Sequence, residues 1–563
     1  MKSSAPVSAL FLASTLATTL ATTIAMMGAI MGAACAAAQP ASKPAPKLIV
    51  AISVDQFSAD LFAEYRQLFI DTGGLGRLSR QGVVFPSGYQ SHAATETCPG
   101  HSTILTGVHP DRTGIIANEW YDLAVRKDKS IYCAEDETAK EFTVSARHLK
   151  VPTLGELMED RDPATRSLSV AGKDRAAVMM AGHKVDQVWW WDGKTFTGPA
   201  GQTSAAADRI KADVAAEIAA PHAASNLPAV CAARNHAVAI GAAKTVGTGR
   251  FERKEGDARA FRASPDFDRA ILAMAAAVAA EMRLDQGPAA NILIVGLSAT
   301  DYVGHTYGTE GAEMCLQLLA LDRELGDFFD KLDETGVDYA VVLTADHGGH
   351  DIPERHREHA APTASRVDPG LDAAAMGTKI ATQLKIQLKP KEQLLYGGAS
   401  GDVYINNALP RRQRARVLAL AKKLYQASPQ VALVLTAAEL QAMPRPVGPP
   451  DAWTLAERAR ASFDPKRSGD LVLLLKPRVT PIPEESAASA SGYVATHGSP
   501  WDYDRRVPIL FWRQGITPFE QPLPVETVDI APTLASLIGL TVPAGTFDGR
   551  CLDLDAGGGT TCK

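Results

Sequence analysis

A set of aspartate and histidine residues stands beside short apolar segments that are spread along the chain. Its members are Asp55, Asp301, His305, Asp346, His347 and His497. Asp301 and His305 are four positions apart, so one helical turn would place both side chains on the same face. Carboxylate oxygens and imidazole nitrogens are standard zinc ligands, and two zinc ions about 4 Å apart can stabilise the attacking and leaving oxygens of a phosphoryl transfer. The set therefore predicts a site for two zinc ions.

A segment rich in hydroxyl groups supplies the candidates for a nucleophile. Thr97 precedes Pro99 and Gly100, which turn the chain, and the residues that follow can start a helix with Thr97 near its N-terminus. Such a position suits an approaching phosphate, and metal coordination can activate a threonine hydroxyl by favouring its alkoxide. Thr97 is therefore the predicted nucleophile. Thr95 and Cys98 are rivals, and a capping cluster without a catalytic role is the alternative.

The elements that must position these groups are short apolar runs without alternation, which suit the central strands of a parallel sheet covered on both faces. They span 48–54, 291–297, 339–344 and 507–512. Helical patterns lie between them over 267–282 and 313–332. Strands that alternate with helices predict an α/β fold, a three-layer sandwich around a mostly parallel sheet. In such sheets ligands bind beyond the carboxyl ends of the strands, where the aspartates and histidines would converge.

The N-terminus differs in composition from the rest of the chain. Lys2 is followed by a long stretch rich in Ala, Leu, Thr and Met that ends in small residues at 36–38. This order is typical of a secretory signal peptide, whereas a retained membrane anchor is the alternative because the stretch could span a bilayer. The predicted organisation is a signal peptide (1–38), a leader (39–46), a catalytic domain (47–555) with capping insertions over 185–265 and 352–494, and a tail (556–563).

No later segment resembles a transmembrane span, so the mature protein is expected to be periplasmic or secreted, without stable membrane insertion. The formal charge of −6 on 563 residues offers no basic surface for nucleic acid.

Cys35 would leave with the signal peptide. The mature chain would keep Cys98, Cys133, Cys231, Cys315, Cys551 and Cys562. An even number in an exported protein predicts disulfides, with Cys551 and Cys562 as the most local pair; buried free thiols are the alternative.

Several motifs taken together resemble the alkaline phosphatase superfamily. They are Thr97-Cys98-Pro99-Gly100-His101, 114–118, 301–305, 345–348, Thr496-His497-Gly498 and 527–534. The resemblance runs from Leu48 to about Arg550 and is strongest to the nucleotide pyrophosphatase/phosphodiesterase branch, and within it to the bacterial phosphate-irrepressible alkaline phosphatases. It implies an exported enzyme that hydrolyses small phosphate monoesters through a phosphothreonine at Thr97.

The resemblance also implies a role for each site residue. One zinc ion would be held by Asp301, His305 and His497. The other would be held by Asp55, Asp346 and His347, with Thr97 completing its ligands. Asn118 would contact a phosphoryl oxygen, and Lys173 and Arg175 would reach the phosphoryl group, although a surface patch is the alternative for this pair. His101, His350 and His356 receive no role.

Three other functions stay open at the level of sequence. A phosphodiesterase could use the same two-zinc scaffold. A sulfatase would carry a C-x-P-x-R motif, which the sequence lacks. A non-catalytic exported binding protein would be expected to have lost a metal ligand, and none of the predicted ligands is missing.

Overall fold

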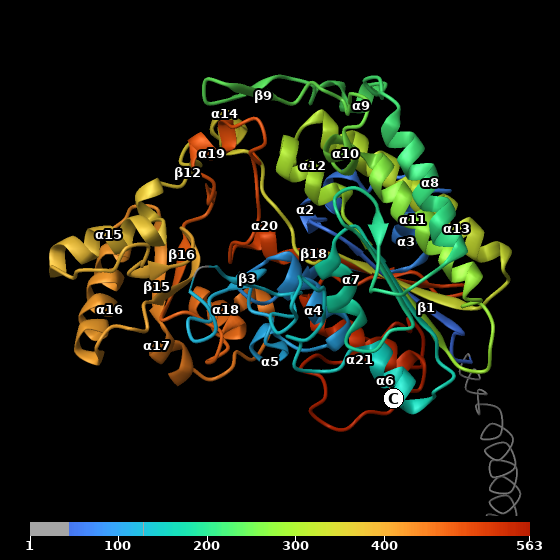
Figure 1. The fold of residues 1–563 in the computed structure, drawn as a ribbon. Helices are drawn as coiled ribbons and strands as arrows, with labels where there is room; N and C mark the ends of the chain where they lie inside the picture. Colours follow the sequence, from blue (N-terminus) through green and yellow to red (C-terminus); the bar gives the residue numbers. More distant parts are fainter. Residues whose placement is uncertain (1–43, 128, 563) are drawn as a thin grey trace, which may run out of the picture. The chain divides into compact units, whose positions relative to one another are not determined.

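A 10-stranded sheet forms the centre of the fold in the computed structural model, which describes residues 44–127 and 129–562 (Figure 1). In order across the sheet, its strands are β19 (Phe519–Glu520), β2 (Val83–Tyr89), β18 (Arg506–Arg513), β11 (Tyr339–Thr344), β1 (Leu48–Val54), β10 (Asn291–Leu297), β5 (Ser167–Ala171), β6 (Gln187–Trp191) and β7 (Phe196–Thr197); β20 (Val525–Glu526) pairs with β2. Strands β11, β1, β10, β5 and β6 run parallel to one another. The predicted, mostly parallel sheet is confirmed.

The apolar run 507–512 is a strand, but the prediction that it runs parallel is wrong. Strand β18 pairs antiparallel with β11 and with β2. It is buried along almost its whole length, and burial on both faces produces the same apolar run for either strand direction. The direction of β18 is set by the side of the sheet from which the chain enters it after α20 (Asp502–Arg505). An apolar run in the sequence carries no information about that direction.

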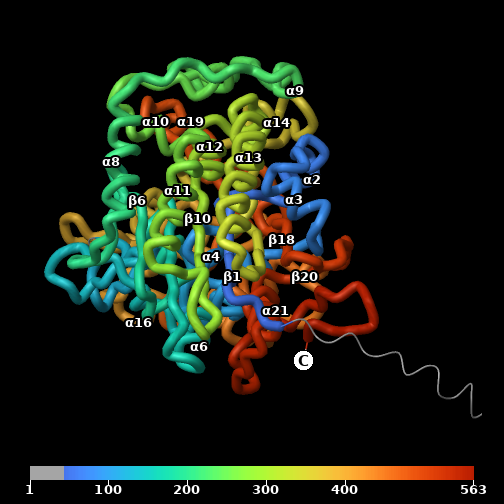
Figure 2. Tube along the Cα trace, turned by 90° about the vertical axis from the view of Figure 1, so that its right-hand side faces the viewer, coloured from blue at the N-terminus to red at the C-terminus, as the bar shows by residue number. Residues whose placement is uncertain are grey.

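Helices cover both faces of the sheet. One face carries α2 (Ala59–Tyr65), α3 (Gly74–Gln81), α8 (Ala205–Ala219), α11 (Pro265–Glu281), α12 (Ala299–Tyr307) and α13 (Ala312–Glu334); the other carries α4 (Thr97–Thr106), α6 (Leu154–Arg161), α7 (Asp174–Ala181) and α21 (Ile530–Leu537). Successive side chains of a strand point to opposite faces, so Val50 and Ile52 enter one core and Ile49 and Ala51 the other. Figure 2 shows α8, α11 and α13 side by side. The three-layer sandwich and both predicted helices, α11 and α13, are confirmed.

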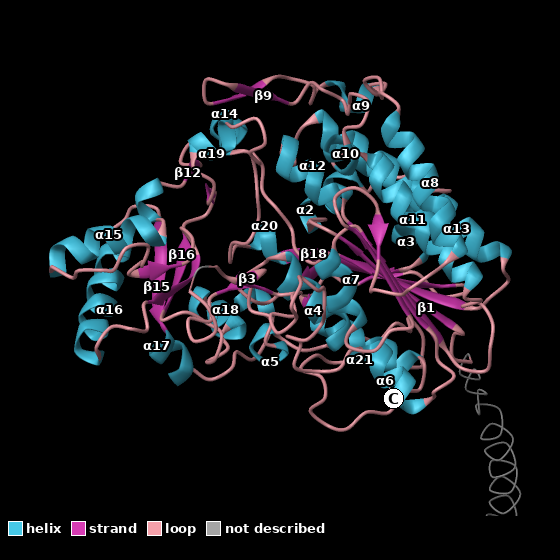
Figure 3. Cartoon of the chain, viewed as in Figure 1, coloured by secondary structure: helices cyan, strands magenta, loops and turns pink. Residues whose placement is uncertain are grey.

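A second, antiparallel sheet lies within the range 352–494 that was predicted to be an insertion (Figure 3). Its order is β13 (Leu395–Tyr396), β14 (Gly401–Ile405), β16 (Leu471–Leu475) and β15 (Val431–Thr436). Helices α15 (Ala373–Leu384) and α16 (Arg411–Gln426) pack on it through a core of their own. In the other predicted insertion, 185–265, β6 and β7 continue the central sheet, and α8 packs on α11.

The remaining elements are short. The helices are α5 (Pro110–Thr113), α9 (Ala229–Ala232), α10 (Ala258–Arg262), α14 (Pro353–His359), α17 (Ala437–Ala442), α18 (Leu455–Ser462) and α19 (Glu484–Ala488). The paired strands are β3 (Glu119–Trp120) with β4 (Ile131–Tyr132), β8 (Val238–Ile240) with β9 (Lys244–Val246), and β12 (Ser365–Arg366) with β17 (Val479–Thr480). Among the residues described, no helix is both long and apolar enough to cross a membrane. The predicted signal peptide lies outside those residues.

The predicted disulfides are present. Cysteines 98 and 133, 231 and 315, and 551 and 562 are paired, so the pair expected from its short separation is confirmed. Cys231–Cys315 joins α9 to α13, whereas Cys98–Cys133 joins α4 to the residue that follows β4. Each bond closes a loop and so restricts the unfolded chain more than the folded one.

His109 ties α5 to the C-terminal part of the chain. Its Nε2 lies 2.9 Å from Glu526 Oε1 and its Nδ1 3.3 Å from Asp548 Oδ2. Burial opposes the charged form, but the two carboxylates raise the pKa of His109 to about 10. Since the unfolded value is about 6.5, the stabilisation is complete below about pH 6.5 and is lost as the pH rises towards 10.

We expect His109→Gln to lower the free energy of unfolding by about 2 kcal/mol at pH 6, and by clearly less at pH 10, because the charged hydrogen bonds are lost. Urea unfolding of both proteins at pH 6, 8 and 10 measures the difference. The exposed His359, changed to Gln, serves as the control and should show no such trend. A difference that stays constant or grows with pH would contradict the assignment.

Candidate metal centre and nucleophile

The carboxyl ends of three neighbouring parallel strands bring five of the six predicted Asp and His ligands to one edge of the sheet; His497 comes from the segment between α19 and α20. Asp55 follows β1 directly, and Asp346 and His347 follow β11. Strand β10 leads into α12, which carries Asp301 and His305 on one helical turn as predicted. Because the strands are adjacent in the order β11, β1, β10, the residues that follow them lie close together.

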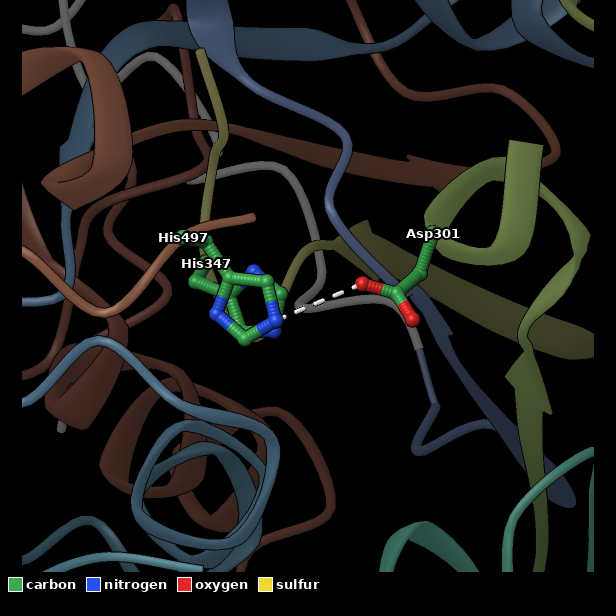
Figure 4. Close-up of side chains that lie close together, drawn as sticks. All are labelled: Asp301, His347 and His497. Atoms are coloured by element: carbon green, nitrogen blue, oxygen red, sulfur yellow. Dashed lines mark ion pairs between the residues drawn. The ribbon is translucent and has the colours of Figure 1, made fainter. Parts of the chain in front are cut away.

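These side chains form two compact groups of potential ligand atoms. One consists of Asp301, His347 and His497, the other of Asp55, Asp346 and His347, and within each group the atoms lie within 4.8 Å of one another. Figure 4 shows the first: His497 Nε2 lies 3.4 Å from Asp301 Oδ1, and the rings of His347 and His497 stack with centroids 3.5 Å apart. In the second group, His347 Nε2 lies 3.1 Å from Asp346 Oδ2 and 3.6 Å from Asp55 Oδ1.

His305 lies beside the first group, with its Nε2 3.3 Å from Asp301 Oδ1. The predicted set of Asp301, His305 and His497 is not one of the compact groups found among the described residues, since His347 takes the place of His305 there. His347 thus contacts ligands of both predicted sets. The division of the ligands between two ions stays a prediction.

Backbone carbonyls fix the orientation of the three imidazole rings. The Nδ1 atoms of His305, His347 and His497 lie 2.8, 2.9 and 2.8 Å from the carbonyl oxygens of Ala495, Gly348 and Thr95. Each Nδ1 therefore donates its hydrogen to a carbonyl oxygen, and Nε2 is the ring atom that faces the carboxylates of the site. Such backbone contacts commonly orient histidine ligands of metals.

Whether these residues suit a metal can be judged from their buried polar atoms. Some of these atoms have no hydrogen-bond partner in the described chain. Asp55 Oδ1 and Thr97 Oγ1 are such atoms, and His347 Nε2 has only the ion-pair contacts with Asp346 and Asp55 described above. Buried polar groups are almost always paired, and leaving one unpaired costs free energy. A divalent cation that accepts oxygen and nitrogen ligands would satisfy all three, so the residues fit a metal site.

The carboxylates of the site strongly influence one another. Burial, followed by the negative charge of Asp346, raises the pKa of Asp55 to about 7. Burial would raise the pKa of Asp301 too, but the imidazole of His305 and the ammonium of Lys173 hold it well below its usual range. Carboxylates buried this close together need positive charge beside them.

Lys173 provides part of that positive charge. Its Nζ lies 2.8 Å from Asp55 Oδ2 and 2.5 Å from Asp301 Oδ2, and the residue is only 3% exposed. The ammonium therefore bridges two of the predicted metal ligands. This contact argues against the alternative of a surface patch, while the predicted contact of Lys173 with a phosphoryl group stays a prediction.

A cavity of about 570 Å³ opens beside the ligands. Asn118, Arg175, His305 and His497 line one side of it, and residues of the four-stranded sheet, including 472–475, line the other. The volume is in the range of pockets that bind small molecules. Two predicted phosphoryl contacts, Asn118 and Arg175, thus share one cavity with two predicted metal ligands, His305 and His497, and the second predicted insertion helps to enclose it.

Two residues without a predicted role, Gln56 and His101, support the site. The backbone N–H of Gln56 donates to Asp346 Oδ1 over 3.1 Å, and its side-chain Nε2 donates to Asp301 Oδ1 over 3.3 Å. His101 Nδ1 lies 2.9 Å from the carbonyl oxygen of Thr97 and 3.1 Å from Asp346 Oδ2. The only sequence signals were the place of Gln56 directly after a ligand and that of His101 one helical turn after Thr97.

A further acidic group, Glu310, Asp351 and His356, is already neutralised by protein contacts. Arg355 Nη1 lies 2.6 and 2.7 Å from the two oxygens of Asp351, and the backbone N–H of Thr309 donates to Asp351 as well. His356 Nε2 lies 3.0 Å from Glu310 Oε1. These contacts make the group an ion-pair cluster.

We expect Lys173→Met to lower the free energy of unfolding of metal-stripped protein by about 3 kcal/mol, because it leaves buried carboxylates uncompensated. Added zinc should narrow the gap to wild type, since it supplies the missing charge. Urea unfolding with and without zinc measures both effects. Lys184→Met, which breaks the exposed pair with Asp160, is the control and should cost less than about 1 kcal/mol. A gap that zinc leaves unchanged would contradict this role for Lys173.

Known proteins resemble this chain over most of its length. The alkaline phosphatase PhoK of a Sphingomonas species is 56% identical over 530 residues, which is 92% of both chains. The alkaline phosphatase PhoD of Zymomonas mobilis is 49% identical over 525 residues, 92% of this chain and 89% of that one. The crystal structure of the alkaline phosphatase PafA superposes with a TM-score of 0.76 at 25% identity and covers 91% of this chain and 99% of its own.

The family match covers the fold and the site together. Residues 49–500 match the family described as type I phosphodiesterase / nucleotide pyrophosphatase. This range contains β1 with Asp55, the helix that begins at Thr97, and His497. The chain therefore belongs to the type I phosphodiesterase / nucleotide pyrophosphatase family.

Proposed function

We propose that this protein is an alkaline phosphatase that hydrolyses phosphate monoesters, with two zinc ions and with Thr97 as its nucleophile. One observation carries the proposal. Thr97 is the first residue of α4, next to the ligand groups, and its Oγ1 atom is buried and has no hydrogen-bond partner among the described residues. A helix N-terminus attracts anions, so a phosphoryl group would be held beside this hydroxyl. The alkaline phosphatases that are 56% and 49% identical to the chain support the same activity.

The close approach of α4 to the ligands explains how Thr97 is positioned. A Cβ atom at Gly100 would collide with the backbone of Asp346, so only glycine allows this contact. His101 holds the carbonyl oxygen of Thr97 and the carboxylate of Asp346 together. The nucleophile and one ligand group are thereby fixed relative to each other.

In the proposed reaction, Thr97 Oγ1 attacks phosphorus and the ester oxygen leaves, which gives a phosphothreonine that water then cleaves. Bound zinc would supply positive charge that favours the threonine alkoxide and stabilises oxygen anions. Asn118 would donate its amide hydrogens to a phosphoryl oxygen. Arg175 would bind a phosphoryl oxygen from the cavity wall, and Lys173 would reach a phosphoryl oxygen from its place between Asp55 and Asp301.

The charge of the substrate favours monoesters. A monoester dianion carries one more negative charge than a diester, and its loose transition state leaves much of that charge on the non-bridging oxygens. Arg175, which lines the cavity, offers a planar fork for two such oxygens, and Lys173 offers a compact charge. An alkyl group on one of these oxygens would remove a charge and crowd the pair.

A phosphodiesterase is the second candidate, because the matching family is described by that activity. The same ligands and nucleophile could serve it. A non-catalytic binding protein is less consistent with the site, since every predicted ligand lies at one edge of the sheet or beside the cavity there.

The disulfides favour an exported protein in the periplasm or the medium that acts on small phosphate esters.

Activity should disappear on chelation and return with zinc, because the ligand atoms need a cation. Metal analysis of active protein should find about two zinc ions per chain. The measurement is elemental analysis together with monoester hydrolysis before and after dialysis against a chelator. Full activity in a preparation free of metal would overturn the two-zinc proposal.

Thr97→Ala should lower kcat for a monoester by about a thousandfold or more, because the attacking oxygen is gone, whereas Thr97→Ser should stay within about tenfold. Rapid acid quenching followed by mass spectrometry should find phosphate on Thr97 in the wild type. Thr95→Ala is the matched control. A nearly normal Thr97→Ala combined with an inactive Thr95→Ala would place the nucleophile at the rival residue.

A further inference from the structure

One short segment, Ile131–Cys133, binds both Asn118 and Arg175. These are the two residues proposed to contact the phosphoryl oxygens from the cavity wall. Asn118 directly precedes β3, which pairs with β4, and β4 ends at Tyr132. Cys133 follows and forms the disulfide with Cys98, the residue next to the proposed nucleophile. We call Ile131–Cys133 together with this disulfide the bracket.

Asn118 is held at both backbone polar groups and at its side chain. Its N–H donates to Glu96 Oε2 over 2.6 Å, and its carbonyl oxygen accepts from the N–H of Cys133 over 2.9 Å. Its Oδ1 accepts from the N–H of Cys98 over 2.8 Å. The Nδ2 atom makes no hydrogen bond within the described chain, and the residue lines the cavity. The amide is thus fixed with its donor group available to a ligand.

The disulfide joins the two residues whose N–H groups hold Asn118. Cys98 and Cys133 are both fully buried, and each donates one of the hydrogen bonds just described. Without the covalent bond, the hairpin could shift relative to α4. Asn118 would then lose its fixed distance from Thr97.

Tyr132 links the same segment to Arg175. Its hydroxyl group donates to Asp174 Oδ1 over 2.6 Å and accepts from Arg175 Nη1 over 3.4 Å. Asp174 begins α7 directly after Lys173, and Arg175 lines the cavity. One hydroxyl therefore orients the guanidinium relative to the hairpin that holds Asn118.

We propose that Tyr132 and the Cys98–Cys133 disulfide are positioning residues that set the spacing of Asn118 and Arg175 around the phosphoryl group. The inference rests on the proposed function, because it needs both side chains to contact substrate. Among the described residues, no side-chain hydrogen bond or ion pair joins Ile131–Cys133 to a predicted metal ligand, and Cys98 adjoins only Thr97. Errors of about 1 Å in such contacts can cost up to about a hundredfold in rate.

The first test uses two variants of different severity. Tyr132→Phe removes only the hydroxyl group, and Cys98→Ala/Cys133→Ala removes the disulfide without leaving a free thiol. Each should lower kcat/KM for a monoester by about ten- to a hundredfold, mainly through kcat, with unchanged zinc content. The matched control is Cys231→Ala/Cys315→Ala, a buried disulfide whose N–H groups donate to Pro228 and Gly311 and not to Asn118. This control should lower the unfolding temperature but change kcat/KM by less than about threefold.

Double-mutant cycles separate positioning from general support of the fold. Tyr132→Phe should have little further effect in an Arg175→Ala background, and loss of the disulfide little further effect in an Asn118→Ala background. Folding is checked by the unfolding temperature and the zinc content of every variant. Additive losses, or equal losses in the control disulfide variant, would overturn the inference.

The outcomes distinguish this inference from the function on which it rests. If Asn118→Ala and Arg175→Ala impair the enzyme while Tyr132→Phe and Cys98→Ala/Cys133→Ala do not, the bracket has no positioning role and the phosphatase proposal stands. If the wild type hydrolyses no monoester, the proposed function fails, and the inference fails with it.

Discussion

The close burial of like charges is the constraint on which the rest of the site depends. Asp55, Asp301 and Asp346 follow neighbouring parallel strands, and each is at most 1% exposed. Carboxylates brought together away from water are unfavourable unless cations neutralise them. Lys173 neutralises two of them directly, and the orphaned oxygen and nitrogen atoms around them suit divalent metal ions.

The remainder of the fold holds this arrangement in place. Parallel strands deliver the carboxylates to one edge, and carbonyl groups orient the imidazoles so that each Nε2 faces the site. Helix α4 places Thr97 against the same edge, because Gly100 lets its backbone approach Asp346. The four-stranded sheet then encloses the cavity from the other side. Asp301 and His305 lie on α12, and the loop residues Asp55, Asp346 and His347 lie within three positions of a strand end, so rigid elements anchor most of the groups that catalysis would need.

Much of the fold and site could be predicted because the signals are local. An apolar run that ends in Asp55, or a helical turn with Asp301 and His305, is visible within a few residues. Contacts between distant segments leave no such trace. The bridge from Lys173 to Asp301 spans 128 positions, and the contact of Gln56 with Asp346 spans 290. The direction of β18 and the choice of disulfide partners also depend on the topology of the whole chain, which no short segment of sequence reveals.

The most direct test of the account compares three esters with one leaving group. Steady-state kinetics of purified, zinc-loaded protein on 4-nitrophenyl phosphate, a 4-nitrophenyl phosphodiester and 4-nitrophenyl sulfate measures which charge pattern the site stabilises. The account predicts kcat/KM for the monoester at least about a hundredfold above that for the diester, with the sulfate lowest, because contacts of this kind are worth a few kcal/mol in the transition state. A diester that reacts as fast as the monoester, or faster, would contradict it.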